Sequence, residues 1–145
     1  MISSGGLGDT VLFCHVIDRF SALAQNGEKV EVLLRSDSIK MGFLIPANIS
    51  IISIDFKRML FDMAYRYKVT NSLFNANYRL VIHTDYLRHP DLDEVLCAAT
   101  HAMETVAMEP RSWLKYNNRL NYNRIIYSRL FDSGSEIQDK IIRWS

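Results

Sequence analysis

Three glycines within four positions, followed at once by an acid and a hydroxyl, form the stretch of this chain best suited to chemistry. Gly5, Gly6 and Gly8 allow a sharp turn and let a ligand approach the peptide groups. Asp9 and Thr10 are residue types that begin helices, so we expect unpaired N–H groups and a positive dipole end facing a ligand. The Asp9 carboxylate is then the reactive group, although its spacing suits a simple helix cap equally well.

Nucleotide-binding motifs are incomplete in this stretch. Gly6-Leu7-Gly8 lacks the third glycine of a dinucleotide fingerprint, and Arg35 and Ser36 stand where that motif places an acid. The chain also has no Lys-Ser or Lys-Thr pair after the glycines, as a phosphate-binding P-loop would require. These departures disfavour a nicotinamide or ATP site.

The elements that would position the glycines alternate between strand and helix along the whole chain. Their strands are too apolar to have a solvated face, which predicts an α/β domain with an open parallel sheet covered on both sides. Right-handed crossovers make this a doubly wound, Rossmann-like sheet in one domain, residues 1–145. We expect strands at 2–4, 29–34, 49–55, 78–84 and 105–108; helices at 10–26, 36–45, 56–75 and 91–103; a loop at 111–123; and helical pieces at 124–131 and 135–144.

Ligands of such sheets lie outside the carboxyl ends of the strands, which selects three loops. These are residues 3–9, 35–38 and 84–90, and they should meet on one rim. In the third loop, Asp85, Arg88 and His89 could contact a phosphate or a sugar, or the loop could simply be solvated. His83, within the preceding strand, is expected to be a buried or rim histidine with its hydrogen bonds satisfied.

Residues 2–12, ISSGGLGDTVL, resemble the opening strand, loop and helix of the heptosyltransferase family. These are ADP-heptose:lipopolysaccharide glycosyltransferases of family nine, whose chains open with an apolar strand followed by Leu-Gly-Asp. Residues 78–83, YRLVIH, resemble a later strand of the family more weakly. The resemblance implies a GT-B architecture, in which the amino-terminal lobe receives the acceptor and the carboxy-terminal lobe holds the nucleotide-sugar. Asp9 occupies the place of the family's general base.

The resemblance therefore implies that this chain is the amino-terminal lobe of an enzyme that transfers a heptose-like sugar from a nucleotide-sugar to a lipopolysaccharide-type or other glycan or glycolipid acceptor. Its donor lobe is missing here, so the isolated chain is not expected to turn over. The implied site has Asp9 as base, and its acceptor-binding residues are Ser4, Gly5, Gly6, Leu7, Gly8, Thr10, Asp85 and Arg88. Neither a cofactor nor a metal is expected, since the four histidines lack ligand spacing. The alternative is a non-catalytic module that binds a phosphorylated ligand through its glycines.

Composition sets further limits on partners and location. A formal net charge of +1 gives no reason to expect a nucleic acid partner, although residues 111–119 interleave basic and aromatic side chains that could line the acceptor site or an interlobe surface. No apolar run approaches the ~20 residues of a membrane span, and no signal peptide is apparent, which favours the cytoplasm. A basic helix face (Lys57, Arg58, Arg66 and Lys68) is either solvated or in peripheral contact with anionic lipid of the inner membrane.

Three further side chains carry expectations about burial. Cys14 and Cys97 lie in apolar helical patterns and should be buried, reduced thiols. Trp144 lies at the end of the sequence with nothing after it to cover its ring, which suggests a fragment or a truncated product.

Overall fold

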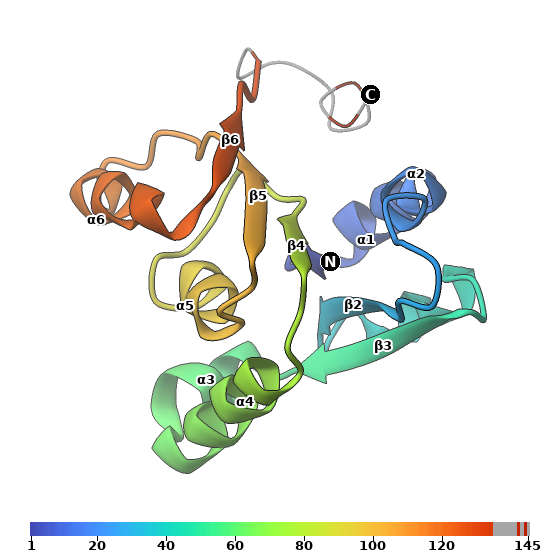
Figure 1. The fold of residues 1–145 in the computed structure, drawn as a ribbon. Coiled ribbons are helices and arrows are strands. Elements are labelled where there is room, and N and C mark those ends of the chain that lie inside the picture. Colours follow the sequence, from blue (N-terminus) through green and yellow to red (C-terminus); the bar gives the residue numbers. More distant parts are fainter. Residues whose placement is uncertain (135–141, 143, 145) are drawn as a thin grey trace.

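Six parallel strands form one sheet in the computed structural model, which describes residues 1–134, 142 and 144 (Figure 1). Their order across the sheet is β3-β2-β1-β4-β5-β6, and every neighbouring pair runs parallel. This is the strand order of doubly wound Rossmann sheets. In such sheets the chain adds strands on one side of β1 and then, from β4 on, on its other side, so the strand order reverses between β1 and β4. The strands are β1 (Ile2–Ser3), β2 (Val30–Arg35), β3 (Ile49–Ile54), β4 (Leu80–His83), β5 (Glu104–Met108) and β6 (Arg129–Phe131).

Helices cover both faces of the sheet, as the apolar strands predict. Alternation along β2 shows the two layers, since Val32 and Leu34 pack with Phe13 on one face and Leu33 packs with Met59 on the other. The first face carries α1 (Leu7–Cys14), α2 (Ile17–Ser21) and the 3-10 helix η1 (Ile39–Leu44); the second carries α3 (Phe56–Phe61), α4 (Met63–Asn75) and α5 (Asp93–Ala99) (Figure 1). The chain is therefore an α/β domain consistent with a Rossmann-like fold.

Two of the expected long helices are each divided in two. The first begins earlier than predicted, at Leu7 with Gly6 as its N-cap, and α1 and α2 are separate helices. The second is interrupted at Asp62, whose carboxylate accepts a hydrogen bond from the backbone N–H of Tyr65 and caps α4. Residues 36–45 contain a 3-10 helix rather than an α-helix.

The prediction for residues 111–131 is wrong. Part of the expected loop forms α6 (Asn117–Asn123), and the expected helix that follows is the short 3-10 helix η2 (Arg124–Ile126) and then the strand β6. β6 has only three residues, two of them exposed, at the edge of the sheet. Such a short, half-apolar segment shows neither helical nor strand periodicity.

Trp144 is buried, so the expectation that nothing covers its ring is also wrong. It packs edge-on against Phe13 with ring centroids 5.8 Å apart, and its indole N–H donates to the carbonyl oxygen of Thr84 at 2.6 Å. The expected helix at 135–144 otherwise lies outside the described residues.

The thiols and the basic helix face differ in detail from expectation. Cys97 is buried, and burial raises the pKa of its thiol to about 12, whereas Cys14 is only partly buried. On α3, the Arg58 guanidinium pairs with Asp62 at 2.9 Å, which leaves the lipid contact a prediction. Within the described ranges, no helix is both long and apolar enough to cross a bilayer.

Candidate functional site

A cavity of about 400 Å³ lies where the strand order reverses, outside the carboxyl ends of β1 and β4. We call it the rim cavity. It brings together the loops after β1 and β4 and the last residue of β2, Arg35, on the rim predicted from the topology, together with Phe56 after β3 and Trp113 after β5. Its lining residues are Ser4, Gly5, Gly6, Asp9, Arg35, Phe56, Asp85, Tyr86, Leu87, His89, Leu92, Asp93 and Trp113.

Asp85 holds the glycine loop (residues 4–8) in place from the end of β4. One carboxylate oxygen, Oδ2, accepts hydrogen bonds from the backbone N–H of Ser4 at 2.7 Å and of Gly5 at 3.2 Å, and from the Ser4 hydroxyl at 3.3 Å. Asp85 is only 4% exposed, so these charge-assisted bonds replace the water that its carboxylate loses. For Ser4 and Gly5, the expectation that the amides of this loop face a ligand unpaired is therefore wrong.

Asp9 lies on the first turn of α1 and folds back over the loop. Its Oδ2 accepts a hydrogen bond from the Gly6 N–H at 3.1 Å, which satisfies one amide at the helix N-terminus and orients the carboxylate. A Cβ atom on Gly5 would lie 2.3 Å from the Asp9 Cβ, closer than real Cβ contacts occur. Only glycine at this position lets Asp9 keep its orientation.

A buried histidine and carboxylate support the floor of the cavity. The His83 Nδ1 accepts a hydrogen bond from the Asp85 N–H at 3.2 Å, which assigns the proton of a neutral ring to Nε2. Nε2 lies 3.5 Å from Asp93 Oδ1, and Asp93 Oδ2 accepts from the His89 N–H at 2.6 Å. Burial by itself raises the pKa of Asp93, but the nearby His83 and the hydrogen bond from the His89 amide outweigh it and hold that pKa below its usual value. His83 is therefore buried as predicted, but the expectation that its hydrogen bonds are satisfied is wrong, because neither its Nε2 nor Asp93 Oδ1 makes a hydrogen bond across the 3.5 Å between them.

Aromatic side chains form one wall. His89, Trp113 and Tyr116 pack together, with ring centroids 4.7 Å apart for His89–Tyr116 and for Trp113–Tyr116. The His89 Nε2 and the Tyr116 hydroxyl are 3.1 Å apart. Trp113 lines the cavity and is only half-buried, so its ring offers a flat apolar surface beside the carboxylates.

The predicted site residues divide into two groups. Asp9 and the predicted acceptor-binding residues Ser4, Gly5, Gly6 and Asp85 line the rim cavity; Leu7, Gly8, Thr10 and Arg88 do not. The Thr10 side chain is buried and its hydroxyl donates to the Gly6 carbonyl at 3.1 Å, which supports the start of α1 instead.

Arg88, predicted to contact a ligand, has a structural role in the fold instead. It is 1% exposed, and its Nε donates to Glu94 at 2.8 Å. Its Nη1 donates to the carbonyl oxygens of Asp85 at 3.0 Å and Met108 at 2.8 Å, which ties the loop after β4 to the end of β5. The Arg88 guanidinium therefore uses its hydrogen bonds within the protein and does not reach the rim cavity.

Sequence reasoning missed several residues of the cavity, including Phe56, Tyr86 and Asp93. Asp93 looks in sequence like an ordinary acid in the first turn of a helix, and no local signal distinguishes it. Tyr86 stands in a loop already selected as part of the rim, so the topology could have pointed to it.

Comparisons with models of protein families, with curated proteins and with solved structures found no match to this chain. Across residues 1–134, 142 and 144, no group of three or more His, Cys, Asp or Glu side chains is placed to hold a metal ion.

Proposed function

We propose that this domain is the acceptor-binding lobe of a GT-B glycosyltransferase of the heptosyltransferase type, with Asp9 as its general base. The observation that carries the proposal is the position of the Asp9 carboxylate in the wall of the rim cavity, at the point where ligands of doubly wound sheets bind. The resemblance of residues 2–12 to the family supports the same assignment.

The polar groups of the cavity suit a polyhydroxylated ligand. Asp9 contributes a carboxylate, a group that accepts hydrogen bonds from hydroxyl groups, and Trp113 provides a surface for the C–H face of a sugar ring. Arg35 also lines the cavity and could pair with an anionic group on a glycolipid acceptor.

In the proposed transfer reaction, the role of this lobe is to remove the proton of the acceptor hydroxyl. As an acceptor hydroxyl oxygen forms a bond to the anomeric carbon of the donor sugar, Asp9 takes the hydroxyl proton, and the bond from that carbon to the nucleoside diphosphate breaks on the opposite face. The hydrogen bond from Gly6 and the absence of a side chain on Gly5 hold the base in one orientation. The nucleotide-sugar would be held by a second lobe.

The geometry does not favour the alternative of a module that binds a phosphorylated ligand through its glycines. Such a module needs backbone N–H groups that point at the phosphate. Here the N–H groups of Ser4, Gly5 and Gly6 donate to the protein's own carboxylates, and an incoming phosphate would meet negative charge.

Binding and transfer test the proposal separately. In a 1H–15N titration, a deacylated inner-core lipopolysaccharide oligosaccharide should shift the amides of residues 4–9 and of Trp113, whereas ADP-heptose should not. In a protein that carries both lobes, Asp9→Asn should abolish transfer and keep oligosaccharide binding. Asp18→Asn, which changes an exposed carboxylate on α2, is the matched control. Normal transfer by Asp9→Asn would refute the base, and shifts caused only by ADP-heptose would refute the acceptor lobe.

A further inference from the structure

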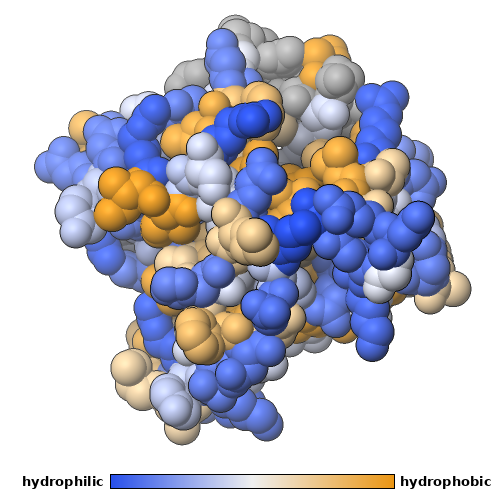
Figure 2. All heavy atoms as spheres, viewed as in Figure 1, coloured by the Kyte–Doolittle hydropathy of each residue, from blue (hydrophilic) through white to orange (hydrophobic). Residues whose placement is uncertain are grey.

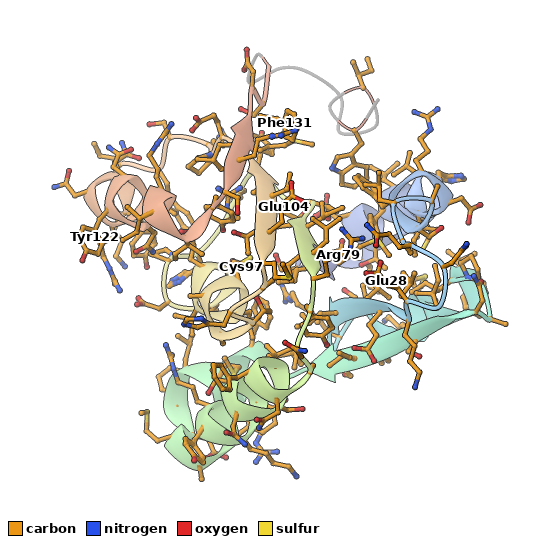
Figure 3. The ribbon with its side chains drawn as sticks, in the orientation of Figure 1. Glu28, Arg79, Cys97, Glu104, Tyr122 and Phe131 are labelled. Carbon is orange, nitrogen blue, oxygen red and sulfur yellow. The ribbon has the colours of Figure 1, made fainter. Side chains whose placement is uncertain are left out.

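The two end strands of the sheet differ in how their free edges are protected. Within the part of the chain that the structure describes, β3 and β6 each have a neighbour on one side only (Figure 1). β6 has three residues and includes Arg129, whose guanidinium lies 5.7 Å from the Phe131 ring centroid (Figure 3). Short length and a cation both keep an edge from pairing with another strand. β3 has six residues, Ile49–Ile54, and has no charged side chain.

β3 lies in the longest stretch of this chain that has no charged side chain, residues 41–54, although 23% of all residues are charged. On the face shown in Figure 2, by contrast, hydrophilic and apolar side chains are interleaved. Proteins place charges, prolines or bulges along a sheet edge that must stay unpaired. The uncharged sequence ISIISI at this edge therefore favours a strand that pairs with another.

The hydrogen bonds between β2 and β3 determine which peptide groups of β3 point away from the sheet. The Ser36 N–H donates to the Ile54 carbonyl at 2.9 Å, so the peptide groups of Ile54 point at β2. In a parallel ladder every second residue of the strand does the same. Ile51 and Ser53 occupy the alternate positions, and their N–H and C=O groups point outward. The free edge therefore presents two donors and two acceptors near its middle.

These four groups match those of a second copy of β3 that runs antiparallel. When Ile51 of one copy lies opposite Ser53 of the other, the two residues exchange both of their N–H···O=C hydrogen bonds. A two-fold axis beside Ile52 forms the same pair a second time, so the outward groups of both residues are paired in both copies. Ile52 then faces its own counterpart across the axis as a close apolar pair.

The 3-10 helix η1 adds apolar surface next to this edge. A Cβ atom on Gly42 would lie 2.9 Å from the Ile51 Cδ1, so η1 packs directly over the edge strand. Phe43, the next residue, is 78% exposed, and Ile39 is 40% exposed. A two-fold axis perpendicular to the sheet places the η1 helices of both copies on the same face of the joined sheet. Apolar side chains of η1 would then leave water as the two copies meet.

We propose that β3 is a self-association edge, at which two copies of this chain join their sheets antiparallel about a two-fold axis beside Ile52. The outward groups of Ile51 and Ser53 complement themselves, which a contact between identical surfaces requires. Such a contact also sets like charges against each other, and residues 41–54 carry none. The rim cavity lies at the ends of other strands, β1 and β4, so the inference goes beyond the proposed function and does not depend on sugar transfer.

Sedimentation velocity and amide hydrogen exchange of the full chain test the proposal. At about 100 μM, a chain with a micromolar Kd should sediment mostly as a dimer, and dilution should release monomers. The Ile51 and Ser53 amides should exchange about tenfold or more slowly in the dimer than in the monomer. The Ile52 amide points at β2, so it should be protected in both states.

Two variants change the edge and keep the ladder with β2. Ser53→Lys places a charge on the edge, and Ser53→Pro removes an outward N–H that β2 does not use. Both should sediment as monomers with the circular dichroism of the native fold. Ser72→Lys, which adds the same charge at an exposed position of α4, is the matched control and should remain dimeric.

Three results would overturn the proposal. The first is a monomeric wild-type chain at about 100 μM, and the second is an open assembly larger than a dimer. The third is a dimer in which the Ile51 and Ser53 amides exchange as fast as in the monomer, or which Ser53→Lys leaves intact, because the two copies would then meet at another surface.

Discussion

The Met1 amino group should make the stability of this fold depend on pH in the range between about 6 and 8. Burial lowers the pKa of this group from 8.0 to about 6 in the folded protein, despite the nearby Glu31, which favours the charged form. Between these values the unfolded chain binds the proton and the folded chain does not. The free energy of unfolding therefore rises with pH across this window.

The size of the effect follows from the shift. A change of about two pKa units corresponds to roughly 3 kcal/mol, lost in full below about pH 6 and recovered above about pH 8. For a domain of ~145 residues whose total stability is about 5–15 kcal/mol, this is a large fraction.

Urea unfolding followed by circular dichroism at a series of pH values measures it. The control is the same chain with an acetylated Met1 amino group, which cannot titrate, so that contributions from the four histidines cancel in the difference. The difference in unfolding free energy between the two proteins should change by roughly 3 kcal/mol across the window. A difference that stays flat from below pH 6 to above pH 8 would refute the desolvation of the Met1 amino group beside β2.

Three further predictions concern the site and its support. Gly5→Ala should displace the proposed base and lower the free energy of unfolding. Gly8→Ala is the control: its added Cβ meets no atom within 4 Å and gains helix propensity, so it should be neutral or stabilising by up to about 1 kcal/mol. Equal urea midpoints for the two variants would contradict the close contact at Gly5. Arg88→Met alone should lower the free energy of unfolding by about 3–5 kcal/mol, because it leaves the buried Glu94 carboxylate without its cation. Adding Glu94→Leu should recover part of that loss in urea unfolding. A larger loss in the double variant would contradict this reasoning. Trp113→Ala should weaken oligosaccharide binding about tenfold in the 1H–15N titration with little effect on folding, and an unchanged Kd would remove the ring from the acceptor site.

Local patterns in the sequence determined most of the sheet. The apolar runs at β2, β3 and β4 and the glycine turn after β1 depend on residues close together in the chain, so they could be read directly. Alternation of strands with helices then predicted parallel pairing and placed three loops on one rim. The rim cavity confirms that placement, because topology alone brings the carboxyl ends of parallel strands to one edge. The edge strand β6 was missed because a segment of three residues, two of them exposed, carries too little periodicity.

Tertiary structure alone decided what Asp85 and Arg88 do. Asp85 binds the amides of Ser4 and Gly5, and the Met1 amino group donates to the Glu31 carbonyl, through contacts between segments far apart in the sequence. Arg88 was expected to contact a ligand and instead is buried against Glu94. Residue type and spacing indicate which groups can ionise or donate a hydrogen bond. Burial and hydrogen-bonding partners determine whether a charged group faces water, a ligand or another charge. Those are properties of the packed fold, and no local stretch of this sequence contains them.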